Sequence, residues 1–416
     1  MRLHWLAALA LMSAACGTVT PPSRSATPVG AAPTARVPSP SATSSPSLPP
    51  GKDYVPPTPF PASAGPYLVD LSWVSDSLGW ALAAVPCAGR LCPTVAATSD
   101  GGATWQPLPA PAVSFYGPTP PPTADCQQAA CVSHIRFATS EIGYLFGPSL
   151  FMTVDGGETW QALTSPPVES LEAAGGEVFR VVYDHTGCPG PCNRTVEEAP
   201  AGSDAWQTVY QIPEGADLDT ATLILAGSQT IYLPIYGDVA KGAEQTTLFR
   251  SLDGGHTWRR MGDPCAGGTP PVDVAFAFAA ASGGFLSVLC FPSGQPQGWA
   301  VLTSSDAGST WGARLPVPDS SAGLLAAPSP GHLVTAGPTG WGDGPATATL
   351  SCSSDGGQSW STAASDQVNL SLTPVGISLW LGFEDATTGR WVGDDQTIWT
   401  TTDGGTSWTP QAFVVG

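Results

Sequence analysis

The 416-residue sequence is poor in charge, because Asp, Glu, Lys and Arg together make up only 11% of it. Basic residues are the scarcer part: 14 Lys and Arg stand against 33 Asp and Glu, for a formal net charge of −19. A nucleic-acid-binding surface needs clustered basic residues, so we expect no nucleic-acid partner. The same shortage argues against adhesion of the folded domain to an anionic bilayer, and we interpret the acidic surplus as an aid to solubility.

The sequence also lacks helical patterning and long apolar runs. No stretch keeps apolar residues at the three- and four-residue spacing of an amphipathic helix. The apolar run at residues 6–12 is too short to span a bilayer as a permanent helix. Glycine and proline are abundant instead, at 48 and 44 residues, which is typical of an all-β, loop-rich chain.

One eight-residue stretch recurs along the chain, and residues 98–105 (TSDGGATW) show it clearly. Its aspartates are spaced 48 to 55 residues apart, and a fixed period near fifty indicates a repeat architecture. A degenerate copy at residues 202–206 lacks the glycine pair. The repeat aspartates are Asp100, Asp155, Asp204, Asp253, Asp306, Asp355 and Asp403, and the tryptophans are Trp105, Trp160, Trp206, Trp258, Trp311, Trp360 and Trp408.

The residue types of the repeat predict a structural role. Asp-Gly-Gly favours a tight turn, because glycine reaches positive φ without a Cβ clash. The carboxylate and the Ser/Thr hydroxyls can bond nearby backbone N–H groups and hold the turn closed. We expect each tryptophan to pack between neighbouring sheets. An aspartate used by its own turn is not available for a ligand.

The repeats resemble the Asp-box, or BNR, motif, whose pattern is Ser/Thr-x-Asp-x-Gly-x-Thr/Ser-Trp. Six copies match it, and the copy at Asp204 lacks the glycines. In that family each box lies between the third and fourth strands of a β-propeller blade. Seven boxes therefore imply an all-β, seven-bladed β-propeller of four-stranded antiparallel blades over residues 67–416.

The first 66 residues predict export and tethering. Residues 1–16 read as a signal peptide with Arg2 at its start and small residues before Cys16, which resembles a bacterial lipobox. The alternative is an ordinary secretory signal with an incidental cysteine. Residues 17–66 are rich in Pro, Ser, Thr and Ala and predict a disordered linker. We expect a lipid-anchored protein on the extracytoplasmic side of the cell membrane, with secretion as the alternative; whether residues 54–60 add a strand to the last blade stays open.

The ten cysteines predict disulfides in an exported protein. With Cys16 set aside for lipidation, Cys352 is left over as a buried free thiol. The others form four predicted pairs: Cys87 with Cys92, Cys126 with Cys131, Cys188 with Cys192, and Cys265 with Cys290. Zinc is the alternative for the close pairs, but only His185 stands at metal spacing, so we expect no metal. In the propeller all four pairs fall on the face opposite to the box turns, where long loops are the usual place for recognition.

Polar residues at the start of several first strands are the ligand candidates. They lie near the mouth of the central channel and form either an acidic ligand site or solvated channel-lining groups. These candidates are Asp70, His134, Arg136, Glu169, Asp219 and Asp273.

The resemblance also allows catalysis to be judged. Sialidases with these boxes use three arginines, a Tyr nucleophile with Glu, an Asp acid/base and a Phe-Arg-Ile-Pro motif. The nearest match here, at residues 179–182 (FRVV), follows the second box and lacks the proline. The chain is more similar to non-catalytic seven-bladed propellers of the photosystem II assembly-factor type, although their basic patch is not matched. We expect a monomeric binding scaffold for an envelope protein or a glycan, with no catalytic residue and no cofactor; a sialidase-like glycoside hydrolase is the alternative.

Overall fold

The computed structural model describes twelve stretches of the chain, all within the compact unit Thr58–Gly416. These stretches are residues 66–87, 90–115, 130–183, 193–213, 218–237, 246–266, 274–291, 298–318, 323–338, 345–369, 380–394 and 396–416.

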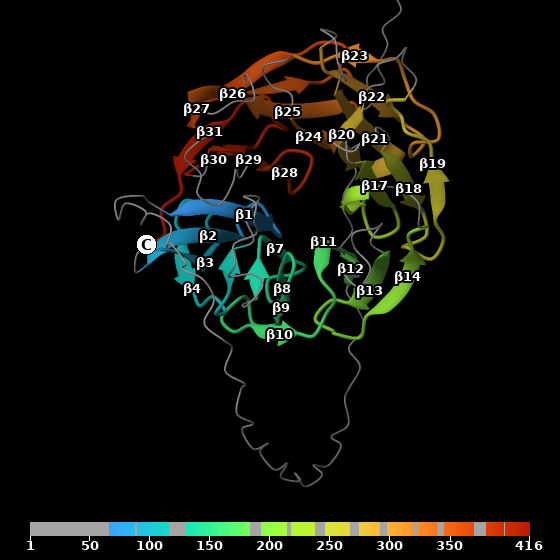
Figure 1. The fold of residues 1–416 in the computed structure, drawn as a ribbon. Helices are drawn as coiled ribbons and strands as arrows, with labels where there is room; N and C mark the ends of the chain where they lie inside the picture. Colours follow the sequence, from blue (N-terminus) through green and yellow to red (C-terminus); the bar gives the residue numbers. More distant parts are fainter. Residues whose placement is uncertain are drawn as a thin grey trace, which may run out of the picture. The chain divides into compact units, whose positions relative to one another are not determined.

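The described residues form seven antiparallel sheets, which are the blades of a seven-bladed β-propeller (Figure 1). The sheets are β1 (Tyr67–Trp73), β2 (Gly79–Cys87), β3 (Arg90–Thr98) and β4 (Gln106–Leu108) in blade 1; β7 (His134–Phe137), β8 (Gly143–Phe146), β9 (Leu150–Thr153) and β10 (Gln161–Leu163) in blade 2; β11 (Val168–Ala174), β12 (Glu177–Tyr183), β13 (Arg194–Pro200) and β14 (Gln207–Gln211) in blade 3; β15 (Leu218–Ala221), β16 (Ile224–Leu225), β17 (Ile231–Gly237), β18 (Thr247–Ser251) and β19 (Arg259–Met261) in blade 4; β20 (Val274–Ala281), β21 (Phe285–Phe291), β22 (Ala300–Ser304) and β23 (Leu315–Pro316) in blade 5; β24 (Leu324–Ser329), β25 (His332–Pro338), β26 (Pro345–Ser353) and β27 (Ser361–Asn369) in blade 6; and β28 (Trp380–Phe383), β29 (Gly389–Asp394), β30 (Thr397–Thr401) and β31 (Thr409–Ala412) in blade 7. A short parallel pair, β5 (Ser114–Phe115) with β6 (Cys131–Val132), links blades 1 and 2.

The predicted all-β fold is confirmed. Strands within each blade pair in chain order from the innermost to the outermost, with β16 as an extra partner of β17 in blade 4. The single helix among the described residues is a three-residue 3₁₀ turn at Ser282–Gly284. Within those same residues, nothing helical is long and apolar enough to cross a bilayer.

Each repeat lies between the third and fourth strands of its blade, and we call these eight residues the repeat turn. In blade 1, the Thr98 hydroxyl donates to Asp100 Oδ1 (2.8 Å) and accepts the Gly102 N–H (3.0 Å). Asp100 then accepts the Thr104 N–H (2.9 Å) and the Thr104 hydroxyl (2.7 Å). Gly101 and Gly102 have φ of 74° and 94°, which favours glycine, although Ala307 takes the first of these positions in blade 5 with φ of 57°.

The other five complete repeat turns use the same bonds, as their serines, threonines and aspartates predict. The side-chain hydrogen bond from Thr104 and its neighbours lowers the pKa of Asp100 to about 2. In each turn the residue after the aspartate donates its N–H to the first hairpin of the same blade, as Gly101 does to the Ser77 carbonyl (2.9 Å). The repeat turns and the first hairpins therefore share one face of the domain.

Seven apolar clusters fill the seven seams between blades, and every repeat tryptophan packs in one of them. Trp160, for example, packs between blades 1 and 2, and Trp258 between blades 3 and 4. The prediction that these rings lie between neighbouring sheets is confirmed. Because the clusters connect blade 7 back to blade 1, the blades form a closed ring.

The ring closes through packing at the C-terminus, and blade 7 is built from its own four consecutive strands. Trp105 of blade 1 forms a parallel bridge with Val415 and accepts the Gly416 N–H at 3.0 Å. Its ring lies edge-on to Phe413 at 5.3 Å between centroids. Residues 54–60, whose part in closure the sequence left open, lie outside the described residues.

Candidate functional site

The innermost strands of blades 1 and 2 bring three of the predicted ligand residues together: Asp70, His134 and Arg136. Asp70 of β1 is buried, and its Oδ2 accepts the Ile135 N–H of β7 at 2.9 Å. His134 Nδ1 lies 3.3 Å from the same oxygen, and half of the His134 side chain (48%) is exposed. Burial raises the pKa of Asp70, but the hydrogen bond from His134 and the charges of His134 and Arg136 outweigh it and hold that pKa below its ordinary value.

Arg136 extends this network across two seams. Its Nη1 donates to the Leu71 carbonyl in blade 1 (3.3 Å), and its Nη2 lies 3.0 Å from Glu172 Oε1 in blade 3. Burial raises the pKa of Glu172, an effect that the charge of Arg136 partly offsets. Glu172 is not among the residues predicted from the sequence, although it lies on the same first strand as Glu169.

Glu169 plays a similar part at the next seam. Its Oε2 lies 2.7 Å from Arg194 Nε, and its Oε1 accepts the Ala221 N–H of blade 4 at 3.0 Å. A carboxylate on one inner strand thus bonds a backbone N–H on the next inner strand, as Asp70 does with Ile135. The expectation of solvated channel-lining groups is therefore wrong for Asp70, because it is buried and occupied in holding two blades together.

The other ligand candidates are not placed by the structure. Asp273 and the side chain of Asp219 lie outside the residues that it describes. Of the four candidates whose side chains the structure describes, His134 is the one that combines an ionisable group with wide exposure, and its ring stacks on Phe146 at 5.0 Å between centroids. The described residues contain no group of three or more His, Cys, Asp or Glu arranged to hold a metal ion.

The face opposite to the repeat turns carries the disulfides that the structure describes. Cys87 and Cys92 bridge the ends of β2 and β3, and Cys265 and Cys290 join the blade 4–5 connection to the end of β21. Both pairs are as predicted. Cys131 is also disulfide-bonded, and Cys352 is buried and free, as expected. The predicted disulfide cysteines Cys126, Cys188 and Cys192 lie outside the described residues.

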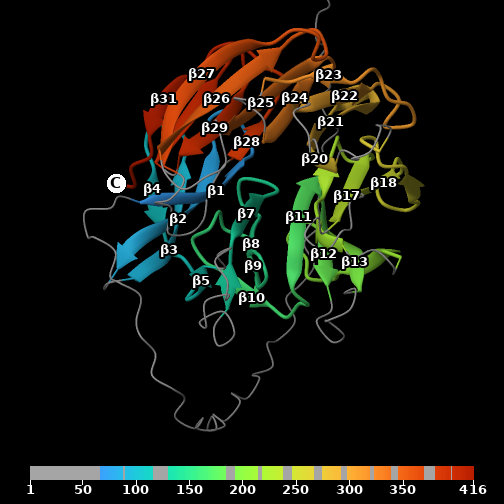
Figure 2. The same cartoon turned by 45° about the horizontal axis from the view of Figure 1, so that its top comes forward.

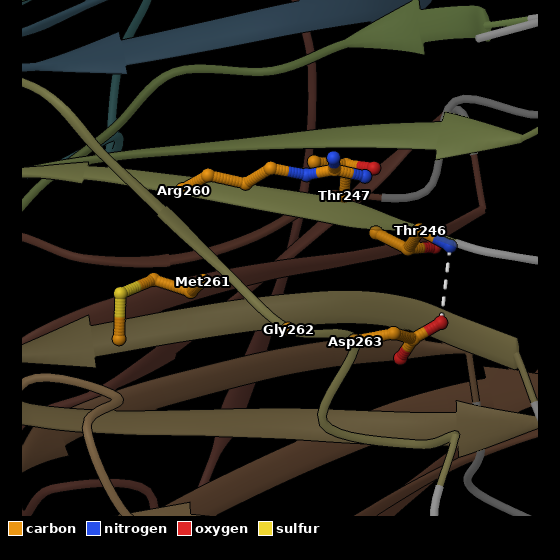
Figure 3. Close-up of a pocket in the computed structure, with 6 residues that line it drawn as sticks. All are labelled: Thr246, Thr247, Arg260, Met261, Gly262 and Asp263. Carbon is orange, nitrogen blue, oxygen red and sulfur yellow. Dashed lines mark hydrogen bonds between the residues drawn. The ribbon is translucent and has the colours of Figure 1, made fainter.

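A polar hollow of about 340 Å³ is lined by residues at the start of β18 and at the end of β19 (Figure 3). Asp263 holds two backbone segments of the hollow together, because its carboxylate accepts the N–H of Thr246 (3.0 Å) and of Cys265 (2.8 Å). Burial raises the pKa of this carboxyl group. The remaining lining residues are Thr247, Arg260, Met261 and Gly262. The hollow offers hydroxyl and guanidinium donors, so it can accept a small polar group of a ligand.

Three aromatic rings lie at the end of blade 5 that is opposite to its repeat turn. Trp299 is buried, and the rings of Phe276 and Phe291 stand edge-on to it at 5.0 and 4.9 Å. Phe276 and Phe291 are nevertheless 43% and 41% exposed. Phe276 occupies a β-bulge of the innermost strand, between Ala275 and Ala277. Bulges re-aim side chains and are common beside functional sites, so this cluster belongs to the candidate surface.

Comparison with solved structures supports the architecture. A GH74 xyloglucanase from Xanthomonas campestris is 15% identical with a TM-score of 0.53; the alignment covers 85% of this chain but only 55% of the enzyme. An oligogalacturonate lyase in complex with manganese is 9% identical with a TM-score of 0.52, over 78% of this chain and 86% of the lyase. YCF48 from Cyanidioschyzon merolae is 15% identical with a TM-score of 0.49, over 82% and 97%.

The xyloglucanase and the lyase support the fold and nothing finer, because their sequence identities to this chain are low. No protein-family model and no curated protein matches the sequence.

Proposed function

We propose that this protein is a lipid-anchored, extracytoplasmic Asp-box propeller that binds an envelope protein or a glycan and catalyses no reaction. One observation carries the proposal. The described disulfides, the polar hollow and the exposed aromatic rings share the face opposite to the repeat turns. A rigid scaffold that presents stapled loops with apolar and polar contacts is typical of a recognition surface.

The arginines support binding over sialidase-like catalysis. That chemistry needs three arginines free to hold a substrate carboxylate, whereas Arg136, Arg180 and Arg194 are each paired with a glutamate. Arg180 is almost fully buried and lies 2.6 Å from Glu197. A guanidinium already paired with a neighbouring glutamate is not available to a substrate, so we keep the glycosidase as the alternative only.

Changing Cys87 and Cys92 together to Ser should weaken partner binding while the fold survives. The bridge closes a separation of five residues at the tip of one hairpin. Its loss should cost about 2 kcal/mol by chain entropy and should loosen that loop. Calorimetric affinity for the partner captured from the envelope, measured beside thermal melting, tests this. Matched changes in the repeat turns, Glu158→Ala and His256→Ala, should leave affinity unchanged; the reverse pattern would move the binding surface to their face.

Anchoring gives a second test. Because Cys16 follows an export signal and precedes a Pro/Ser/Thr-rich segment, Cys16→Ser should release the protein into the medium. Fractionation of cells that express each form, followed by immunoblotting, measures the distribution. A mutant that still needs detergent for its extraction would contradict lipidation at this cysteine.

A further inference from the structure

The outermost strand of blade 6, β27, differs from the other outer strands of the ring. It is nine residues long (Ser361–Asn369), whereas β4, β10, β14, β19, β23 and β31 have two to five. It pairs with β26 along its length, and residues 364–369 extend beyond the usual length of an outer strand. Figures 1 and 2 show β27 on the outer side of β26, at the rim of the ring.

Among the described residues, β27 pairs with β26 alone, so its other edge is unpaired. Proteins usually protect such an edge by shortness, lysine, proline or a bulge. The sequence of β27, STAASDQVN, contains neither lysine nor proline, and its bulge at Ala363 comes before the extension. Its one charge is turned inward, since Asp366 Oδ2 accepts the Trp399 Nε1–H at 2.9 Å.

The hydrogen bonds identify which backbone groups face outward. The Gln367 N–H donates to the Asp366 carboxylate (2.8 Å) and so points away from β26. Because N–H and C=O groups alternate between the two sides of an antiparallel strand, Ser365 and Asn369 face the same way as Gln367. Ser365 is exposed, and it lies opposite Thr349 of β26 in the strand register. This edge offers Ser365 N–H and C=O and the Gln367 C=O to an added strand.

We infer that β27 is a docking edge for an extended segment of a partner polypeptide, which adds to blade 6 as a fifth strand through main-chain hydrogen bonds. The net charge of the chain indicates which kind of segment binds at β27. A chain with a net charge of −19 repels a second copy and attracts a segment that carries lysine or arginine. The β27 edge is a second contact surface, separate from the face opposite to the repeat turns on which the proposed function rests. A negative result at one surface therefore leaves the other untouched.

A synthetic probe tests the edge directly. The probe is a short peptide of alternating threonine and valine with a lysine at each end, and its control is the same peptide N-methylated at alternate amides. Fluorescence anisotropy should show binding of the first peptide, with the methylated peptide at least about tenfold weaker because two hydrogen bonds are lost. Equal binding of the two peptides, or none of either, would overturn the inference.

Variants at Ser365 locate the contact. Ser365→Pro removes an outward N–H without touching the ladder to β26, so it should weaken probe binding at least about tenfold. Ser365→Ala removes the hydroxyl and keeps the N–H, so it should bind as the unchanged protein does. If Ser365→Pro fails to fold on thermal melting, the methylated peptide still decides. A concentration-dependent dimer in sedimentation, abolished by Ser365→Pro, would assign the edge to a second copy instead and refute a partner segment.

Discussion

Replacing Trp105 with alanine should destabilise the propeller by roughly 3–5 kcal/mol, as expected for a tryptophan removed from a packed core. Trp105 is only 2% exposed, and it packs edge-on to Trp73 at 5.7 Å and to Phe413 at 5.3 Å. It occupies the seam where the last blade meets the first. Loss of this ring therefore empties the one seam whose two blades are adjacent in space but far apart in sequence.

Urea unfolding at neutral pH measures the effect, and Trp360→Ala is the matched control. Trp360 holds the same position in the repeat turn of blade 6 but is only partly buried, with its Nε1–H donating to the Pro316 carbonyl. Its loss should cost less than half as much, because less apolar surface returns to water. Equal losses for the two variants would show that burial at the closing seam adds no stability.

The repeat turns could be predicted from sequence because all their chemistry is local. Thr98, Asp100 and Thr104 bond one another within seven residues, so residue types alone indicate the turn. The seam position of the tryptophans also followed from the repeat, because a ring three residues past the turn has only the neighbouring blade to pack against. The blade count and the face on which the turns lie came from the resemblance to the Asp-box family, which places one box between the third and fourth strands of each blade.

The roles of the inner-strand residues could not be predicted, because their partners are distant in sequence. Asp70 is fixed by Ile135, 65 residues away, and Arg136 by Glu172 on a third blade. No residue close to Asp70 in the sequence indicates that its carboxylate is buried rather than solvated. The length of β27 could not be predicted either, because it depends on how far β26 continues to pair with it beyond the bulge at Ala363.

The closing seam also contains a buried carboxyl group, Glu384, which should make stability fall as pH rises toward neutrality. The Glu384 side chain is 5% exposed, and neither of its oxygens has a hydrogen-bond partner among the described residues. Arg390 Nη1 lies 3.6 Å away, while Arg390 Nη2 donates to the Asp76 carbonyl in blade 1 at 2.7 Å. Burial, only partly offset by Arg390, raises the pKa of Glu384 to about 7.

The direction of the pH effect follows from where the proton is held. Between the ordinary pKa of 4.5 and about 7, the folded protein keeps the proton on Glu384 while the unfolded chain has lost it. The free energy of unfolding should therefore decrease by about 3 kcal/mol across this window because of this one group, and should not change further above it. The glutamine of Glu384→Gln cannot titrate. The free energy of unfolding of the unchanged protein should therefore decrease with pH relative to that of Glu384→Gln across this window. Urea unfolding from pH 4.5 to 8 measures it, with the exposed Glu158→Gln as a control for the loss of one charge; parallel curves for Glu384→Gln and the unchanged protein would show that this carboxyl group titrates normally.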